Sequence, residues 1–493
     1  MSGSSALVEM ALPVHKNHRS RFIIAVNDMK KTFGPTQPLI LFALMILILA
    51  PRPLAGVLDL RSANRFESTG NDTQAAQAYA AAAERIPWMP SLWEKAGISA
   101  LQSGDVKNAI SLLNKSVERS AISARGWFSL GTAYQASGQL SLAVKAWEQA
   151  LPLAQAYFDL ATAQRSLGNF TGAIGFWRAT IAMEPENAAA HYTLALLLMA
   201  TAPGEALPEL MQAARLDPEL DPTVQGLRTA LNTGLASGDG ATHFLVSGQA
   251  LAALGEWDLA AEAFRNAIAW RSNDADAWAW LGEAQQQLGH DGGPEMEQAL
   301  ALGAQSTLVQ GLYGLYLQRQ GQPQAARAAF QKAADLEPED PGWQMALGSA
   351  CEQTGDLVAA YGYYLQAVEL DPQNASTWRA LVAFSLNNTV DVAGSGLPAA
   401  HKLVELAPDD WQSYDLAGQA EFLLEEYSAA EVYLKKAIQL SPTQAAPGLH
   451  LGLVYLQTGE RASAWYYLNL AMTFDPDGSY GWQAGRLLEQ YFP

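Results

Sequence analysis

The sequence lacks the residues from which most metal and catalytic sites are built. Its only cysteine is Cys351, and its seven histidines stand without acidic or cysteine neighbours at metal-ligand spacing. It contains no Gly-x-x-x-x-Gly-Lys loop and no His-Glu-x-x-His, Cys-x-x-Cys or Gly-x-Ser-x-Gly motif. We therefore expect no cofactor, no metal and no catalytic residue, and a protein that is not an enzyme.

The sequence is also poor in positive charge. It has 30 lysines and arginines against 49 aspartates and glutamates, a net charge of -19, which argues against nucleic acid as a partner. The distribution is uneven, because residues 1–53 carry six basic and two acidic residues, a balance of +4, and the remainder carries -23. Cys351 occupies an apolar place in a repeat, so we expect a small buried side chain rather than half of a disulfide.

A 34-residue pattern occurs twice in succession, from Thr307 and again from Pro341. Large residues fill places 7, 11 and 24 and small ones fill places 8, 20 and 27, so the apolar places recur three or four residues apart on one face of a helix. A glycine at place 15 ends a first helix, because a left-handed residue just past a helix is cheapest as glycine. A proline at place 32 stops a second helix. The pattern predicts helix pairs that are stable only in a stack.

This pattern resembles the tetratricopeptide repeat, and about twelve copies follow one another in nearly continuous register. The resemblance implies an all-α fold, a right-handed α-solenoid of stacked antiparallel helix pairs, with one hydrophobic helix before it. The residues that define the copies are the glycines at place 8 and the prolines at place 32: Gly97, Gly131, Gly248, Gly282, Gly314, Gly348, Gly418, Gly452, Pro185, Pro338, Pro372, Pro442 and Pro476.

Breaks in the register predict the domain boundaries. We expect a first half of the solenoid over residues 56–220 and a second half over residues 241–478. Between them, residues 221–240 combine one extra helix with a flexible Ser-Gly-Asp-Gly turn, so we expect a joint there. Residues 479–493 are expected to form a C-terminal capping helix.

The N-terminal residues differ in composition from the repeats. Residues 1–38 form a basic leader, and the apolar run LILFALMILILA follows it, which is typical of a signal peptide or membrane anchor over residues 39–58. Translation from Met29 would give the usual opening of a bacterial signal sequence, so we hypothesise that residues 1–28 are not translated.

Two interpretations of this segment stay open. Twelve helical residues span about 18 Å, short of a bilayer core of about 30 Å, which suits a signal peptide. An anchor requires the helix to continue through Pro51 to Leu58, and the poor cleavage sites favour it.

The resemblance also implies a site. In that family the first helix of each pair lines a concave groove through places 2, 5, 9, 12 and 13. Those places predict a peptide groove lined by Arg125, Phe128, Thr132, Gln135, Phe158, Thr162, Arg165, Tyr192, Leu196, Leu245, Gln249, Glu283, Gln318, Arg319, Met345, Arg379, Gln419 and Phe422. Basic residues that hold acidic carboxyl ends in some members are missing from places 5 and 9, except for Arg379. A partner segment with apolar and amide side chains therefore fits better.

The expected function is a non-enzymatic scaffold that binds other proteins or peptide segments in this groove, in envelope assembly, secretion or polysaccharide export. The basic leader stays inside, so we expect the solenoid outside the cytoplasm, periplasmic or extracellular, tethered to the cytoplasmic membrane or secreted if the segment is cleaved. Two alternatives stay open. The chain is a substrate-holding subunit of a glycosyltransferase or peptidase complex, or it self-associates, with the groove of one copy holding a helix of another.

Four tryptophans, Trp257, Trp270, Trp280 and Trp465, do not follow the register directly. Packing in the core is the first interpretation of each, and a sugar- or peptide-binding surface is the alternative.

Overall fold

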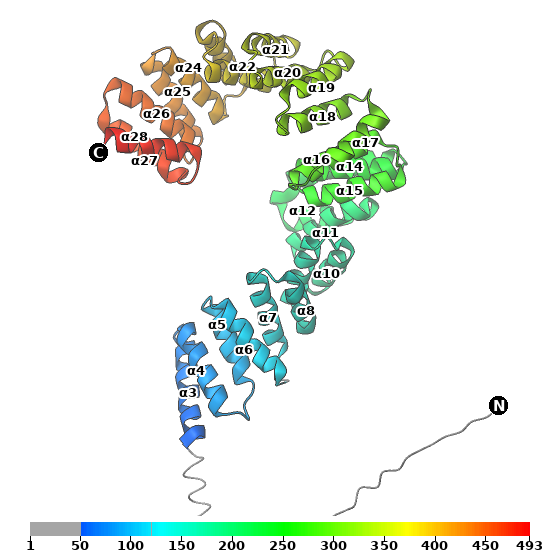
Figure 1. The fold of residues 1–493 in the computed structure, drawn as a ribbon, viewed down its shortest axis with the longest axis vertical. Helices are drawn as coiled ribbons and strands as arrows, with labels where there is room; N and C mark the ends of the chain where they lie inside the picture. Colours follow the sequence, from blue (N-terminus) through cyan, green and yellow to red (C-terminus); the bar gives the residue numbers. More distant parts are fainter. Residues whose placement is uncertain (1–50, 120) are drawn as a thin grey trace, which may run out of the picture. The chain divides into compact units, whose positions relative to one another are not determined.

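The computed structural model describes residues 51–119 and 121–493. These residues form α-helices joined by short turns, with no strand (Figure 1), so the all-α prediction is confirmed. In chain order the helices are α3 (Pro51–Ser68), α4 (Asp72–Arg85), α5 (Leu92–Gln102), α6 (Val106–Glu118), α7 (Ala124–Ala136), α8 (Leu140–Ala150), α9 (Ala154–Ser166), α10 (Phe170–Met183), α11 (Ala188–Thr201), η1 (Pro203–Glu205), α12 (Ala206–Leu216), η2 (Pro218–Leu220), α13 (Asp221–Ala236), α14 (Gly240–Ala253), α15 (Trp257–Trp270), α16 (Ala275–Gln287), α17 (Gly293–Gly303), α18 (Thr307–Arg319), α19 (Pro323–Leu336), α20 (Pro341–Gln353), α21 (Leu357–Leu370), α22 (Ala375–Asn388), η3 (Val392–Gly396), α23 (Leu397–Leu406), α24 (Trp411–Leu423), α25 (Tyr427–Leu440), α26 (Ala445–Thr458), α27 (Arg461–Phe474) and α28 (Ser479–Tyr491).

The described residues divide into two compact units, one that ends at Ala190 and one that begins at His191. The first unit stacks the pairs α3–α4, α5–α6, α7–α8 and α9–α10. The second stacks α14–α15, α16–α17, α18–α19, α20–α21, α22–α23, α24–α25 and α26–α27, and α28 packs on its end. Residues 221–240, which we expect to form a joint, lie inside the second unit, where α13 packs on α14 and contacts α12.

The predictions for the leader, the start of translation and the apolar run before Pro51 lie outside the described residues. Residues 51–58, the expected end of the signal or anchor segment, form the first part of α3, which packs on α4. Gly56 permits this packing, because a Cβ atom there would lie 2.5 Å from Cγ1 of Ile86. None of the helices in the described ranges is both long and apolar enough to cross a membrane.

Glycine, proline and acidic caps set the ends of the helices. Gly321 and Gly355, both at place 15, have φ angles of +70° and +77°, a left-handed conformation that costs glycine little. Pro338 stands two residues after the end of α19, at the predicted stop. Several first helices begin at side-chain caps, as where Asp340 Oδ1 accepts a hydrogen bond of 2.8 Å from the Gly342 N–H.

The glycine at place 8 faces the large residue at place 24 of the same pair. A Cβ atom added to Gly314 would lie 2.3 Å from Phe330, and one added to Gly131 would lie 2.4 Å from Trp147. The same relation joins glycines and large residues in further pairs: Gly97 and Leu113, Gly248 and Phe264, Gly348 and Tyr364, Gly418 and Leu434, Gly452 and Leu468. The large residue that each glycine accommodates therefore belongs to the glycine's own helix pair.

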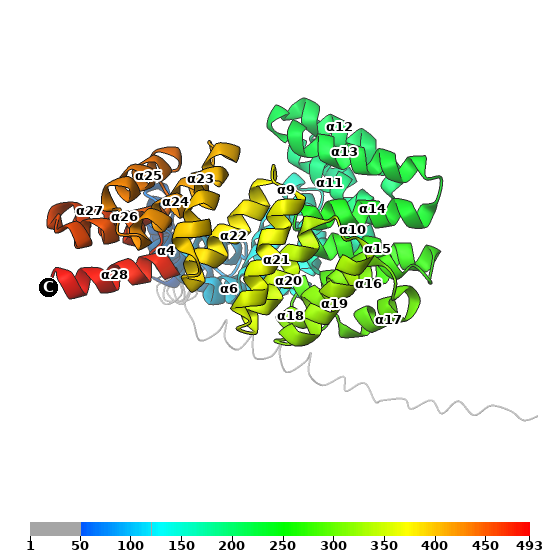
Figure 2. The same cartoon turned by 90° about the horizontal axis from the view of Figure 1, so that it is seen from above.

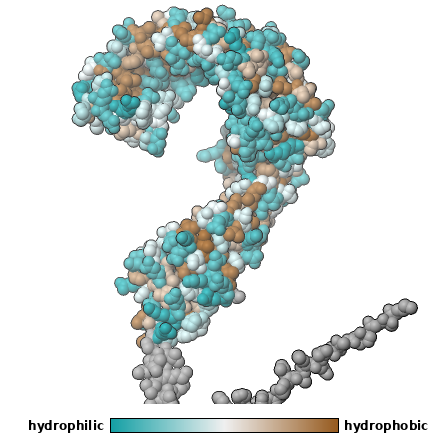
Figure 3. Space-filling model, viewed as in Figure 1, coloured by the Kyte–Doolittle hydropathy of each residue, from teal (hydrophilic) through white to brown (hydrophobic). Residues whose placement is uncertain are grey.

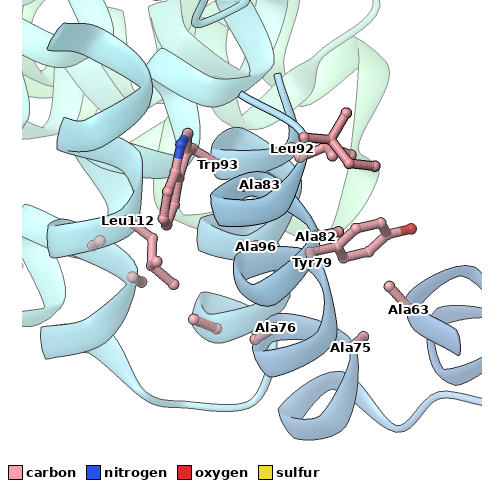
Figure 4. Close-up of a cluster of buried hydrophobic side chains, with 14 residues drawn as sticks. Ala63, Ala75, Ala76, Tyr79, Ala82, Ala83, Leu92, Trp93, Ala96 and Leu112 are labelled. Atoms are coloured by element: carbon pink, nitrogen blue, oxygen red, sulfur yellow. The ribbon is translucent and has the colours of Figure 1, made fainter. Parts of the chain in front are cut away.

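The core of each unit is a series of buried clusters, formed by the helices of one pair and by the pairs next to it. Figure 4 shows the start of the first unit, where Tyr79 of α4 points toward Ala63 of α3, and Trp93 of α5 lies near Leu112 of α6. The Tyr79 hydroxyl donates a hydrogen bond of 2.7 Å to Asn64, so the buried ring keeps its polar end satisfied. Burial, with Glu67 beside the hydroxyl, raises the pKa of Tyr79.

The stacking is asymmetric in the second unit. First helices of consecutive pairs contact each other, α20 with α22, α22 with α24 and α24 with α26. The second helices α19, α21, α25 and α27 make no comparable contacts with one another within the described structure. First helices are therefore closer together than second helices, which places them on the inner, concave side.

Candidate functional site

A groove lies on the concave side near the C-terminal end of the second unit. Side chains from α22, α24, α26 and α28 line it, and these helices lie next to one another (Figure 2). The groove has two parts with volumes of about 250 and 470 Å³. Both parts share the residues Leu386, Asn387, Gln419, His450 and Gln483.

One end of the groove is apolar. Leu386 and Leu449 form its floor and are 8% and 2% exposed. Phe422 and Leu453 are partly buried at its sides, and the Phe422 ring packs 5.8 Å from that of Tyr427. A hollow of this size with fixed walls suits one large apolar side chain of a partner.

The other end is polar. The buried Asp415 accepts a hydrogen bond of 2.9 Å from the Gln419 amide, and its second oxygen lies 2.8 Å from Nδ1 of His450. These contacts fix Gln419 and His450 in the wall of the groove. Tyr480 of α28 sets its ring edge-on to His450, with 6.2 Å between the centroids.

Arg379 closes this polar end from α22 and donates a hydrogen bond of 2.7 Å to Asp410, the cap of α24. Asn387, Gln412 and Gln483 add amide groups along the same wall. The end therefore offers hydrogen-bond donors and acceptors without a large net charge, as a peptide backbone requires. Within residues 51–119 and 121–493, no group of three or more histidine, cysteine, aspartate or glutamate side chains is placed to hold a metal ion.

The structure brings three of the predicted groove residues, Arg379, Gln419 and Phe422, into this one groove. Two others, Glu283 of α16 and Arg319 of α18, bind each other instead. The guanidinium donates two hydrogen bonds, of 2.7 and 2.6 Å, to the carboxylate, which is buried. Because both oxygens of Glu283 accept hydrogen bonds from Arg319, this ion pair connects neighbouring first helices, and the carboxylate is not available to bind a partner segment.

Other predicted residues of the second unit lie along the first helices before the groove. Gln318 donates a hydrogen bond of 3.0 Å to Ser349 of the next first helix. Leu245, Gln249 and Met345 are partly buried. Burial, with Glu256 nearby, raises the pKa of Tyr192, which is also partly buried.

Leu196 corrects the predicted lining. It is 2% exposed, and its neighbours from Leu194 to Ala200 are buried as well. This stretch of α11 is apolar on every side, and such a helix is covered all round, so place 9 does not reach solvent in this copy.

The predicted residues of the first unit lie on α7 and α9. Phe128 and Arg165 are partly buried, and Phe158 is 37% exposed with its ring edge-on to Trp177 at 5.1 Å. Thr132 and Thr162 donate hydrogen bonds of 3.1 Å to the carbonyls of Phe128 and Phe158 within their own helices. Arg125 and Gln135 are exposed.

Several groove residues escaped the sequence reasoning. Among them, His450 and Asp415 are 35 residues apart and join the first helices of adjacent repeats, as the predicted residues Glu283 and Arg319, 36 apart, do elsewhere. Such pairs can be recognised in the sequence as an acidic and a basic side chain that are separated by about one repeat. Tyr480 and Gln483 have no such signal, because the terminal helix α28 has no equivalent in the pattern.

The four irregular tryptophans differ in their exposure to solvent. Trp280 stacks on Phe264 at 5.8 Å, and Trp257 is partly buried, so both pack against the repeats. Trp270 and Trp465 are 69% and 52% exposed. In the face shown in Figure 3, the second unit is mostly hydrophilic with scattered hydrophobic patches.

Known proteins share parts of this sequence at low identity. "Anaphase-promoting complex subunit 3" of Schizosaccharomyces pombe is 26% identical over 151 residues, which cover 30% of this chain and 22% of the relative. "BBSome complex member BBS4" of Bos taurus is 28% identical over 151 residues, covering 30% of this chain and 28% of the relative. The chain thus matches only about a quarter of the length of these relatives.

Among solved structures, the yeast protein Tom70 is 15% identical with a TM-score of 0.41, and the alignment covers 88% of this chain and 95% of Tom70. Sequence models described as "Tetratricopeptide repeat" match residues 94–157, 158–221, 314–375 and 412–444, and one described as "TPR repeat" matches residues 248–289. Together these matches cover more than half of the chain and fall on the helix pairs described above. The chain belongs to the tetratricopeptide repeat family.

Proposed function

We propose that the chain is a non-enzymatic scaffold and that the groove between α22, α24, α26 and α28 binds a segment of a partner protein. One observation carries the proposal: an apolar pocket and a wall of amide and imidazole groups share a single concave groove. The pocket takes one large apolar side chain, and the polar wall forms hydrogen bonds with the backbone beside it.

The residues of the groove are preorganised for this role. Asp415 holds both Gln419 and His450, so these groups lose little side-chain entropy when a segment binds. Leu386 and Leu449 are already buried, so the floor of the pocket needs no rearrangement. Binding energy therefore goes to contacts with the partner rather than to ordering the site.

The test compares two variants of the full-length chain, Leu453→Arg and Val432→Arg. Leu453 lines the pocket, whereas Val432 is 68% exposed on α25, a second helix, so the control adds the same charge and bulk away from the groove. Binding is measured on an array of short peptides of varied sequence. We expect Leu453→Arg to abolish binding of the captured peptides and Val432→Arg to retain it. Equal binding by both variants would contradict the proposal.

We also propose that residues 39–58 contain a signal peptide or membrane anchor that places the repeats outside the cytoplasm, where they recruit proteins of envelope assembly, secretion or polysaccharide export. The basic leader and the apolar run that follows it support this proposal. A reporter that is active only outside the cytoplasm, fused after Pro493, should be active. A well-expressed but inactive fusion would contradict export.

A further inference from the structure

The two units differ sharply in charge. Residues 54–190 contain eleven basic and eleven acidic residues, so this part of the first unit is neutral. Residues 191–493 contain 13 basic and 36 acidic residues, a net charge of -23. The whole excess of negative charge therefore belongs to the unit that contains the groove.

Exposed carboxylates lie within two or three residues in sequence of Trp411 and Leu423, which line the groove. Asp409 precedes the cap of α24 at the polar end, and Glu425 and Glu426 follow Phe422 in the turn at the apolar end. All three are exposed, and among the described residues none of them has a lysine or arginine within ion-pair distance. By contrast, Asp415 in the groove and Asp410, which binds the groove residue Arg379, already have partners.

We infer that the segment bound in this groove is a basic peptide of a partner protein, with one large apolar side chain flanked by lysine or arginine. The inference rests on the proposed docking function of the groove. The apolar side chain enters the pocket beside Phe422, and the flanking cations meet the exposed carboxylates at the rim. An acidic segment would meet uncompensated repulsion from the same carboxylates and from the unit as a whole.

The experiment measures binding of three peptide sets to the full-length chain by fluorescence anisotropy. The sets share one leucine or phenylalanine and differ only in flanking residues, which are lysine, glutamine or glutamate. We expect lysine peptides to bind about tenfold more tightly than glutamine peptides in about 0.1 M salt, and the difference to shrink in about 1 M salt, where the Debye length falls from about 10 to about 3 Å.

A triple variant with Asp409→Asn, Glu425→Gln and Glu426→Gln should lose most of this preference. The matched control removes three exposed carboxylates of second helices, through Glu297→Gln, Asp335→Asn and Glu369→Gln, and should keep it.

The outcomes separate the inference from the proposed function. If all three peptide sets bind equally and Leu453→Arg abolishes binding, the groove is a docking site but the inference is wrong. If no set responds to Leu453→Arg, the docking function itself fails. If a peptide from the basic leader of this chain competes more strongly than every lysine peptide, a second copy replaces the partner protein as the source of the segment.

Discussion

Replacing Gly314 with alanine tests a contact that recurs in seven of the helix pairs. The new Cβ atom would lie 2.3 Å from Cε1 and 2.6 Å from Cδ1 of Phe330, whose side chain is 1% exposed. Carbon atoms prefer separations of about 3.5–4.0 Å, so α18 and α19 must move apart by roughly 1 Å or the ring must leave its rotamer.

Two effects of opposite sign decide the result. Alanine in a helix interior is favoured over glycine by about 1 kcal/mol, whereas overpacking a core costs about 1–3 kcal/mol. A pair can adjust in part, because Ala161 holds the same place opposite Trp177, and both side chains are buried there. We therefore expect Gly314→Ala to lower the free energy of unfolding by about 1 kcal/mol.

The control is Gly362→Ala in α21, where the glycine is exposed and an added Cβ atom meets no atom within 4 Å. Only the higher helix propensity of alanine acts there, so the free energy of unfolding should rise by about 0.5–1 kcal/mol. Because the chain has two units, the assay is hydrogen exchange of amides in α18–α19 for Gly314→Ala and in α20–α21 for Gly362→Ala, read as local opening free energies. If Gly314→Ala is as stabilising as Gly362→Ala, the close approach at place 8 is not real.

Three further predictions concern single side chains. Glu425 has a φ angle of 64° at a place that other repeats fill with glycine, so its backbone is strained. Glu425→Gly should therefore raise the free energy of unfolding by about 1 kcal/mol, measured as a higher urea midpoint. An unchanged midpoint would contradict the strain. Arg319→Ala leaves the buried carboxylate of Glu283 without its partner and should cost about 2–3 kcal/mol in urea unfolding; a loss below about 0.5 kcal/mol would mean that the pair is unimportant. The hydrogen bond from Lys435 lowers the pKa of Glu431 below 4.5, so the ionised carboxylate stabilises the fold fully above that pH, and this stability is lost as the pH falls through the lower pKa of the folded state. In urea unfolding at a series of pH values, Glu431→Gln should reduce this loss of stability in acid. Identical pH profiles of the variant and the original chain would contradict the prediction.

The repeat architecture was predictable because each helix pair obeys a local rule. The left-handed Gly321, the proline stop at Pro338 and the small Gly314 all follow from backbone conformation and packing within about one repeat. Rules of that range appear in the sequence as a period. For this reason the fold followed from the sequence even where single copies were degenerate.

The site was harder to predict because it depends on how adjacent repeats curve. Which first-helix side chains meet, as His450 meets Asp415, depends on the distance between layers and not on the register alone. The burial of Leu196 has the same origin, since its place in the register is exposed at Thr162 of α9 but buried in α11. The contribution of Tyr480 depends on how α28 packs against α26, which no repeat pattern contains.

The most direct test of the account is site-specific photocrosslinking of the full-length chain in cells, followed by mass spectrometry of the crosslinked peptides. A photoreactive residue is placed at Gln419 in the groove, and in a separate chain at Val358, which is 85% exposed on the second helix α21. We expect position 419 to capture one discrete basic segment of a partner protein, Leu453→Arg to remove this capture, and position 358 not to capture the segment. Capture of the same set of proteins at both positions, unchanged by Leu453→Arg, would contradict the assignment of the groove as the binding site.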